Sequence, residues 1–87
     1  MTPKAPQARS FYTRIPLIRT ERGISRKELA AAVGVHYQTI GYIERGEYSP
    51  SLDLALRLAR HLELPVEALF SLEPFPPLDV KALAPES

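Results

Sequence analysis

Apolar residues recur along this chain at spacings of three and four positions, which places them on one face of a helix. Five short segments show the pattern, near residues 13–22, 25–34, 36–46, 51–62 and 65–70. The residues expected to face inward are Ile15, Ile18, Leu29, Ala30, Val33, Ile40, Ile43, Leu54, Ala55, Leu58, Ala59 and Leu62. No segment shows the two-residue alternation of a strand. The pattern therefore predicts an all-α fold, a compact bundle of five helices.

Residues that begin or end helices separate these segments. Ser25 and Glu28 form a capping box, in which each side chain bonds a backbone amide near the other residue. Ser51 has the position of an N-cap for the fourth helix. Gly34 permits a positive φ in a turn of three or four residues, between helices at 25–34 and 36–46. Two helices joined so closely, the second with a free outer face, have the layout of a helix-turn-helix.

Length and composition fit one small folded domain. The 87 residues divide into a flexible N-terminal arm at 1–10, a domain at 11–72 and a proline-rich C-terminal tail at 73–87. Cysteine is absent, so disulfides and thiolate metal sites are excluded. No apolar run approaches the ~20 residues of a membrane helix, and we expect a cytoplasmic protein with no membrane partner.

The small net charge of +1 conceals an asymmetry. Residues 1–48 hold eight basic and four acidic groups, whereas residues 49–87 hold three basic and six acidic groups. A basic half beside an acidic half is typical of a molecule that meets a polyanion on one side, although chance scatter of surface charge is an equal alternative.

Three stretches of the chain resemble the phage repressor/Cro-type (XRE) family of helix-turn-helix transcriptional regulators. They read RTERGISRKELAAAVGV, YQTIGYIERGEYSPSLDLALRLA and LPVEALF, and the resemblance covers about 60 residues within 13–72. It implies a lambda repressor-like DNA-binding domain whose second motif helix enters the major groove of double-stranded DNA. The function expected is a sequence-specific regulator, most simply a repressor that binds a palindromic operator as a homodimer.

The resemblance also assigns roles to individual positions. Base contacts are expected from the start of the recognition helix, at Tyr37, Gln38, Gly41 and Tyr42. Phosphate contacts are expected at Arg26, His36, Arg45 and Tyr48, and an ion pair between Arg19 and Glu44. His36 departs from the small hydroxyl residue that is usual there, and we expect it to cap the helix poorly and to face a phosphate instead. Gln38 is the strongest candidate base reader, because an amide can bond adenine at N6 and N7.

Plainer structural interpretations compete with several of these roles. The two tyrosines have the alternative of belonging to the core, and Gln38 and Arg26 the alternative of being ordinary surface residues. Arg19 and Glu44 have the alternative of being separate surface charges. His36 and His61 lie 25 residues apart without clustered carboxylates or cysteines, which argues against a metal site or catalysis. We expect neither an enzyme nor a cofactor.

Apolar residues beyond the needs of a five-helix core indicate a dimer surface. The expected dimer contacts are Val66, Leu69, Phe70, Leu72 and Phe75. Two other functions remain open at this point. One is an antitoxin that uses the domain on its operator and the tail on a toxin. The other is a protein-interaction module that has kept the fold and lost DNA binding.

Overall fold

The computed structural model describes residues 10–76. Three of its helices have a side-chain N-cap. Helix α2 (Arg26–Val33) starts after Ser25 with both bonds of the predicted capping box, and α4 (Leu52–Leu62) starts after Ser51, whose hydroxyl accepts from the Leu54 amide. Helix α3 (Tyr37–Glu44) starts after His36. The five predicted helices are confirmed, with α1 at Ile15–Glu21 and α5 at Val66–Leu69.

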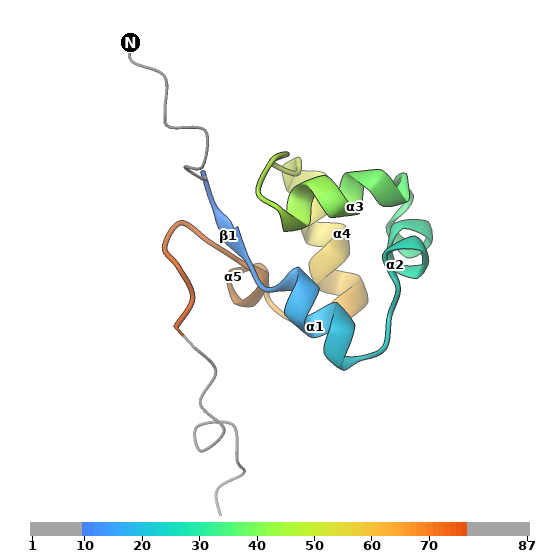
Figure 1. Ribbon diagram of the computed structural model, residues 1–87, viewed down its shortest axis with the longest axis horizontal. Coiled ribbons are helices and arrows are strands. Elements are labelled where there is room, and N and C mark those ends of the chain that lie inside the picture. The colour runs from blue at the N-terminus through green and yellow to red at the C-terminus, as the bar shows by residue number, and fades with distance from the viewer. Residues whose placement is uncertain (1–9, 77–87) are drawn as a thin grey trace, which may run out of the picture.

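The helices surround one apolar core. Figure 1 shows α4 passing through the middle of the bundle, with α1, α2 and α3 around it and α5 beside β1 (Tyr12–Thr13). Most residues predicted to face inward are buried, and Ile18 is half-buried against them. Phe11 and Leu69 also belong to the core, which the helical pattern did not predict. The buried cluster therefore joins both ends of the described chain.

A short antiparallel strand pair closes the bundle. Strand β1 (Tyr12–Thr13) pairs with β2 (Phe70–Ser71), with Thr13 opposite Phe70. The Phe11 and Phe70 rings pack at 5.9 Å between centroids. The expectation of an all-α fold therefore holds for the architecture, with this two-residue pairing added to it.

Two arginines join helix ends to neighbouring helices. The Arg22 guanidinium, just after α1, donates to the Leu62 carbonyl at the end of α4 at 2.7 Å. The Arg57 guanidinium, on α4, donates to the Val33 carbonyl at the end of α2, also at 2.7 Å. Carbonyls at the last turn of a helix lack helical partners, so each contact satisfies an otherwise open acceptor. The Arg57 contact also fixes the turn between α2 and α3.

The predicted arm at residues 1–10 lies outside the described residues except for Ser10, and so does the tail from residue 77 onward. Within residues 10–76, no helix is long and apolar enough to cross a membrane.

Candidate nucleic-acid interface

The turn between α2 and α3 sets the direction of α3 across the surface of the bundle. Gly34 ends α2 with φ at 78°, a conformation that favours glycine. Val35 packs against the core immediately after it. Ile40 and Ile43 anchor the inner side of α3, which leaves the opposite side of that helix at the surface.

His36 caps α3, contrary to the sequence expectation that it would cap poorly. Its Nδ1 accepts a hydrogen bond from the Gln38 amide at 3.1 Å. An imidazole nitrogen can therefore replace the hydroxyl oxygen that usually serves at this position. The same ring stacks on Tyr37 at 4.7 Å between centroids. With Nδ1 accepting, the remaining ring nitrogen, Nε2, is available to donate outward.

The outer face of α3 carries two tyrosines and a glutamine. Tyr37 is 41% exposed and Tyr42 is 45% exposed, so the alternative that they belong to the core is wrong. Each lies beside a cation: Lys27 Nζ is 5.2 Å from the Tyr37 ring centroid, and Arg45 Cζ is 5.1 Å from that of Tyr42. Gln38 is exposed, and its side-chain amide makes no hydrogen bond to the described part of the chain.

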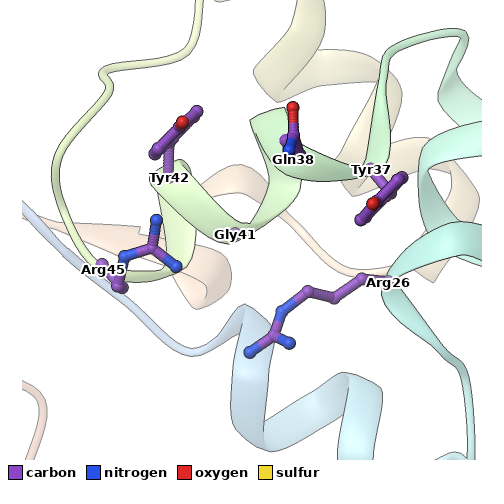
Figure 2. Close-up of a pocket in the computed structure, with 6 residues that line it drawn as sticks. All are labelled: Arg26, Tyr37, Gln38, Gly41, Tyr42 and Arg45. Carbon is purple, nitrogen blue, oxygen red and sulfur yellow. The ribbon is translucent and has the colours of Figure 1, made fainter.

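These side chains border a shallow hollow of about 270 Å³ on the surface of α2 and α3. Figure 2 shows Gln38 and Tyr42 projecting from α3, while the Arg26 side chain extends from the start of α2 toward Gly41. The lining residues are Arg26, Tyr37, Gln38, Gly41, Tyr42 and Arg45. The hollow therefore brings all four predicted base contacts together with two of the predicted phosphate contacts.

Gly41 forms the floor of this hollow and is itself buried. A Cβ atom there would lie 3.3 Å from Arg45 Nη1, and 3.9 Å from both Cδ and Nε of Arg26. Arginine side chains from the start of α2 and the end of α3 thus converge over the glycine. The two arginine side chains therefore form the solvent-facing surface at this position, and Gly41 itself is scarcely exposed.

Glu44 connects this face to the interior of the bundle. Its side chain is 3% exposed and accepts from Arg19 Nε at 2.7 Å and Arg19 Nη2 at 3.3 Å. It also accepts from Arg26 Nε at 2.9 Å. The sequence paired Glu44 with Arg19 but did not link it to Arg26, since 18 positions separate the two residues and no local pattern marks the contact. The Arg26 side chain that lines the hollow is therefore held in place by the buried Glu44 carboxylate.

Comparisons with known proteins identify the motif. The sequence profile of the helix-turn-helix family HTH_3 matches residues 17–69, which is more than half of the chain. This protein belongs to the XRE-type helix-turn-helix family.

The relatives and a solved structure agree with this membership. An HTH-type transcriptional regulator of Archaeoglobus fulgidus is 45% identical over 58 residues, which are 67% of this chain and 83% of that protein. The cryptic phage CTXphi transcriptional repressor RstR of Vibrio cholerae is 33% identical over 61 residues, covering 70% of this chain and 55% of RstR. The restriction-modification controller protein C.AhdI from Aeromonas hydrophila superposes with a TM-score of 0.60 at 33% identity, covering 63% of this chain and 83% of C.AhdI. The chain is thus a transcriptional regulator with a helix-turn-helix DNA-binding domain, and its family points away from an enzyme.

The dimer contacts predicted for this helix-turn-helix regulator do not form one surface. Leu69 is 0% exposed and belongs to the core, so its assignment to the dimer surface is wrong. Val66 and Phe70 line an apolar hollow of about 320 Å³ with Phe11, Leu52 and Ala55 among its walls.

The other two predicted dimer contacts lie elsewhere. Leu72 is exposed beyond β2. Phe75 packs beneath Arg14, with the guanidinium carbon 4.4 Å from the ring centroid, and lines a separate hollow beside α1. Tyr48, predicted to contact phosphate, is 48% exposed in the loop between α3 and α4 and lies outside the hollow over Gly41.

The histidines of this regulator stay apart from acidic clusters. Within residues 10–76, no group of three or more histidines, cysteines and carboxylates has the arrangement of a metal site. His36 serves as a helix cap, and His61 is exposed in the last turn of α4.

Proposed function

We propose that this protein is a transcriptional repressor that binds a partly palindromic operator as a homodimer, with one α3 helix in the major groove of each half-site. The observation that supports it most is the outer face of α3, where Gln38 and two exposed tyrosines are flanked by Arg26 and Arg45. Polar and aromatic groups between cations suit base edges between two phosphate backbones. The similarity to the repressor RstR favours repression over activation.

Gln38 is the proposed reader of adenine. It lies in the first turn of α3, the part of a recognition helix that penetrates furthest into the groove. Its amide has no competing hydrogen bond within residues 10–76, so both its donor and its acceptor are available for adenine N7 and N6. Tyr37 and Tyr42 on either side present ring edges that suit thymine methyl groups and sugars.

Arg26 is the proposed phosphate anchor at the start of α2. Glu44 accepts a hydrogen bond from its Nε at 2.9 Å, so a buried carboxylate holds the guanidinium beside α3. Its side chain is 51% exposed, so the charge remains accessible from solvent. His36 through Nε2 and Tyr48 through its hydroxyl are the proposed additional phosphate contacts, because both are exposed near α3.

The apolar hollow between α4, α5 and β2 is the proposed dimer surface. Leu52 at its edge is 73% exposed, and Leu56 one turn further along α4 is 52% exposed. Leucines exposed to this degree beside an apolar hollow favour a protein partner. A second copy is the proposed partner, because a two-fold dimer places two recognition helices about 34 Å apart, one turn of duplex.

Two substitutions separate base reading from phosphate binding. Gln38→Ala should weaken binding to the preferred site by about 1–3 kcal/mol and leave binding to scrambled DNA unchanged. Arg26→Ala should weaken binding to both, and lower the slope of log K against log salt by about one unit. Fluorescence anisotropy over a series of salt concentrations measures both quantities.

Arg60→Ala is the matched control, since Arg60 is an exposed arginine on α4 outside the hollow. Equal losses on preferred and scrambled DNA for Gln38→Ala would reject it as a base reader. Failure of the wild type to bind any duplex at low salt would reject DNA binding and favour a protein-interaction module.

A further inference from the structure

Gly41 occupies the middle of a recognition helix without a conformational reason to be glycine. Its φ is not positive, and glycine is the poorest helix former after proline. Nor does another helix approach closely at this point, because the atoms nearest to an added Cβ belong to the side chains of Arg45 and Arg26. The glycine therefore makes room for arginines on the outer face of α3.

The Arg45 side chain folds back along α3 by one turn. Arg45 follows the last residue of the helix, yet its Nη1 lies 3.3 Å from the position of a Cβ on Gly41. The guanidinium carbon lies 5.1 Å from the Tyr42 ring centroid, and Nε lies 3.3 Å from a carboxylate oxygen of Glu47. The guanidinium therefore lies beside Gly41, between the Tyr42 ring and the Glu47 carboxylate of the loop that follows α3.

The guanidinium remains accessible in this position. The Arg45 side chain is 52% exposed, and its terminal nitrogens make no hydrogen bond to residues 10–76. It borders the same hollow as Gln38. Its two terminal nitrogens form a planar fork of donors, and such a fork matches the O6 and N7 acceptors of guanine in the major groove.

Arg26 differs from Arg45 in how it is held. The Nε of Arg26 is bound by the buried Glu44, and its side chain enters the hollow from the start of α2. The Arg45 side chain instead starts at the C-cap of α3 and folds back beside Gly41. The two arginines thus reach the hollow from different elements, and only Arg26 is bound to the buried carboxylate of Glu44.

We propose that Arg45 is a base reader specific for guanine, and that Gly41 determines this specificity by leaving space for its guanidinium. The proposal rests on the proposed function, DNA binding through α3, and replaces the phosphate role that the sequence predicts for Arg45. Because Arg45 and Gln38 share one hollow, the guanine lies within a base pair or two of the adenine that Gln38 reads.

Atomic substitution in the DNA tests this assignment. On the preferred site, each guanine is replaced in turn by 7-deazaguanine, which lacks the N7 acceptor but keeps base pairing and phosphates. For wild type, one guanine in each half-site should be sensitive, with binding weakened about 2- to 10-fold. Replacing the same base pair by A·T should weaken binding roughly 5- to 150-fold. In Arg45→Met this sensitivity should vanish, whereas the control Arg60→Met should keep it.

A uniform loss in Arg45→Met, with the same 7-deazaguanine sensitivity as wild type, would overturn the proposal and return Arg45 to phosphate binding. That result would leave DNA binding through α3 intact. The absence of any preferred site for wild type would instead reject the proposed function itself. The two failures are therefore distinguishable in one set of titrations.

Gly41→Ala tests the role of the glycine. The added methyl group is tighter against Arg45 than ordinary contacts, so the guanidinium must shift by a few tenths of an ångström. The preference for guanine should fall by at least about twofold, because a bidentate contact needs both bonds aligned. Thermal unfolding should not occur at a lower temperature, since alanine is the better helix former. An unchanged guanine preference in this variant would overturn the role of Gly41.

Discussion

At the scale of single residues, Glu44 links α3 to two other helices beneath the proposed DNA interface. One carboxylate, 3% exposed, receives bonds from Arg19 on α1 and Arg26 on α2. Arg19 also donates to the Ile24 carbonyl at 3.1 Å, so it ties the loop before α2 to the same group. A buried ion pair adds little net stability, yet removal of one partner leaves a charge without compensation.

Arg19→Ala should therefore destabilise the fold. Arg26 would still contact Glu44, so the expected loss in the free energy of unfolding is at the lower end for a broken buried pair, about 3 kcal/mol. Urea denaturation in the absence of DNA measures it. The matched control is Glu47→Ala, which removes an exposed ion pair to Arg45 and should cost less than about 1 kcal/mol. Equal effects of the two substitutions would contradict the buried network.

The capping box makes the start of α2 sensitive to acid. Hydrogen bonds from the backbone and then the hydroxyl of Ser25 lower the pKa of Glu28 below its usual 4.5. A pKa lower in the folded than in the unfolded state means that the contribution is complete well above pH 4.5. It is lost as pH falls through the folded-state pKa.

The stability difference between wild type and Glu28→Ala should therefore be larger at neutral pH than at about pH 3. Urea denaturation at both pH values measures the difference. The comparison is Glu67→Ala, which removes an exposed carboxylate on α5 that forms no helix cap. If the Glu28 difference stays constant over this pH range, its carboxylate does not act in the capping box.

At the scale of elements, local chemistry made the helices predictable. Ser25, Glu28, Gly34 and Ser51 act through neighbours within a few positions, so their spacing alone located the ends of α2 and the start of α4. The pairing of β1 with β2 was not predictable in this way. Each strand has two residues, too few to show alternation, and partners such as Thr13 and Phe70 lie far apart in sequence.

In the candidate site, too, local spacing predicted some features and failed to predict others. Gln38 could be expected on an outer face because Ile40 and Ile43 define the inner one, whereas the core alternative for the two tyrosines was excluded only by their exposure in the structure. The bond from Arg26 to Glu44 and the return of Arg45 over Gly41 depend on long side chains crossing between or along helices. Sequence spacing does not fix the path of such side chains, so their roles needed the structure.

His36 provides a test at the start of α3. Because Nδ1 accepts from the Gln38 amide, His36→Ala should lower the free energy of unfolding by about 1 kcal/mol without DNA. His36→Asn should retain most of that stability, since asparagine is a strong N-cap. Thermal or urea unfolding of the two variants makes the comparison. If alanine is as stable as wild type, the imidazole does not serve as a cap.

At the scale of the whole molecule, the number of basic residues overstates how many cations are available to the proposed DNA interface. Arg22 and Arg57 donate to helix-end carbonyls, and Arg19 is bound to Glu44. Arg26, Lys27 and Arg45 remain around the outer face of α3, each within reach of an exposed aromatic ring or the hollow over Gly41. The basic character of residues 1–48 is thus partly structural and partly concentrated at the proposed interface.

The apolar hollow at α4 and α5 lies apart from those cations, and this separation favours assembly through one surface and DNA binding through the other. Leu52→Glu should weaken the proposed dimer at least about tenfold without unfolding the domain, because Leu52 is already 73% exposed. Sedimentation velocity over a concentration series measures the dissociation constant. Leu17→Glu, at a leucine on α1 outside this hollow, is the control. A Leu52→Glu protein as dimeric as wild type would place the interface elsewhere.

The most direct test of sequence-specific regulation is selection from a pool of random duplex DNA by purified wild-type protein at near-physiological salt. The account predicts one enriched motif made of two inverted half-sites, with centres about 34 Å apart. Each half-site should contain a guanine close to an adenine, as expected for Arg45 and Gln38 in one hollow. Enrichment of no sequence, with weak binding that disappears as salt rises, would contradict the account and show that α3 does not read DNA.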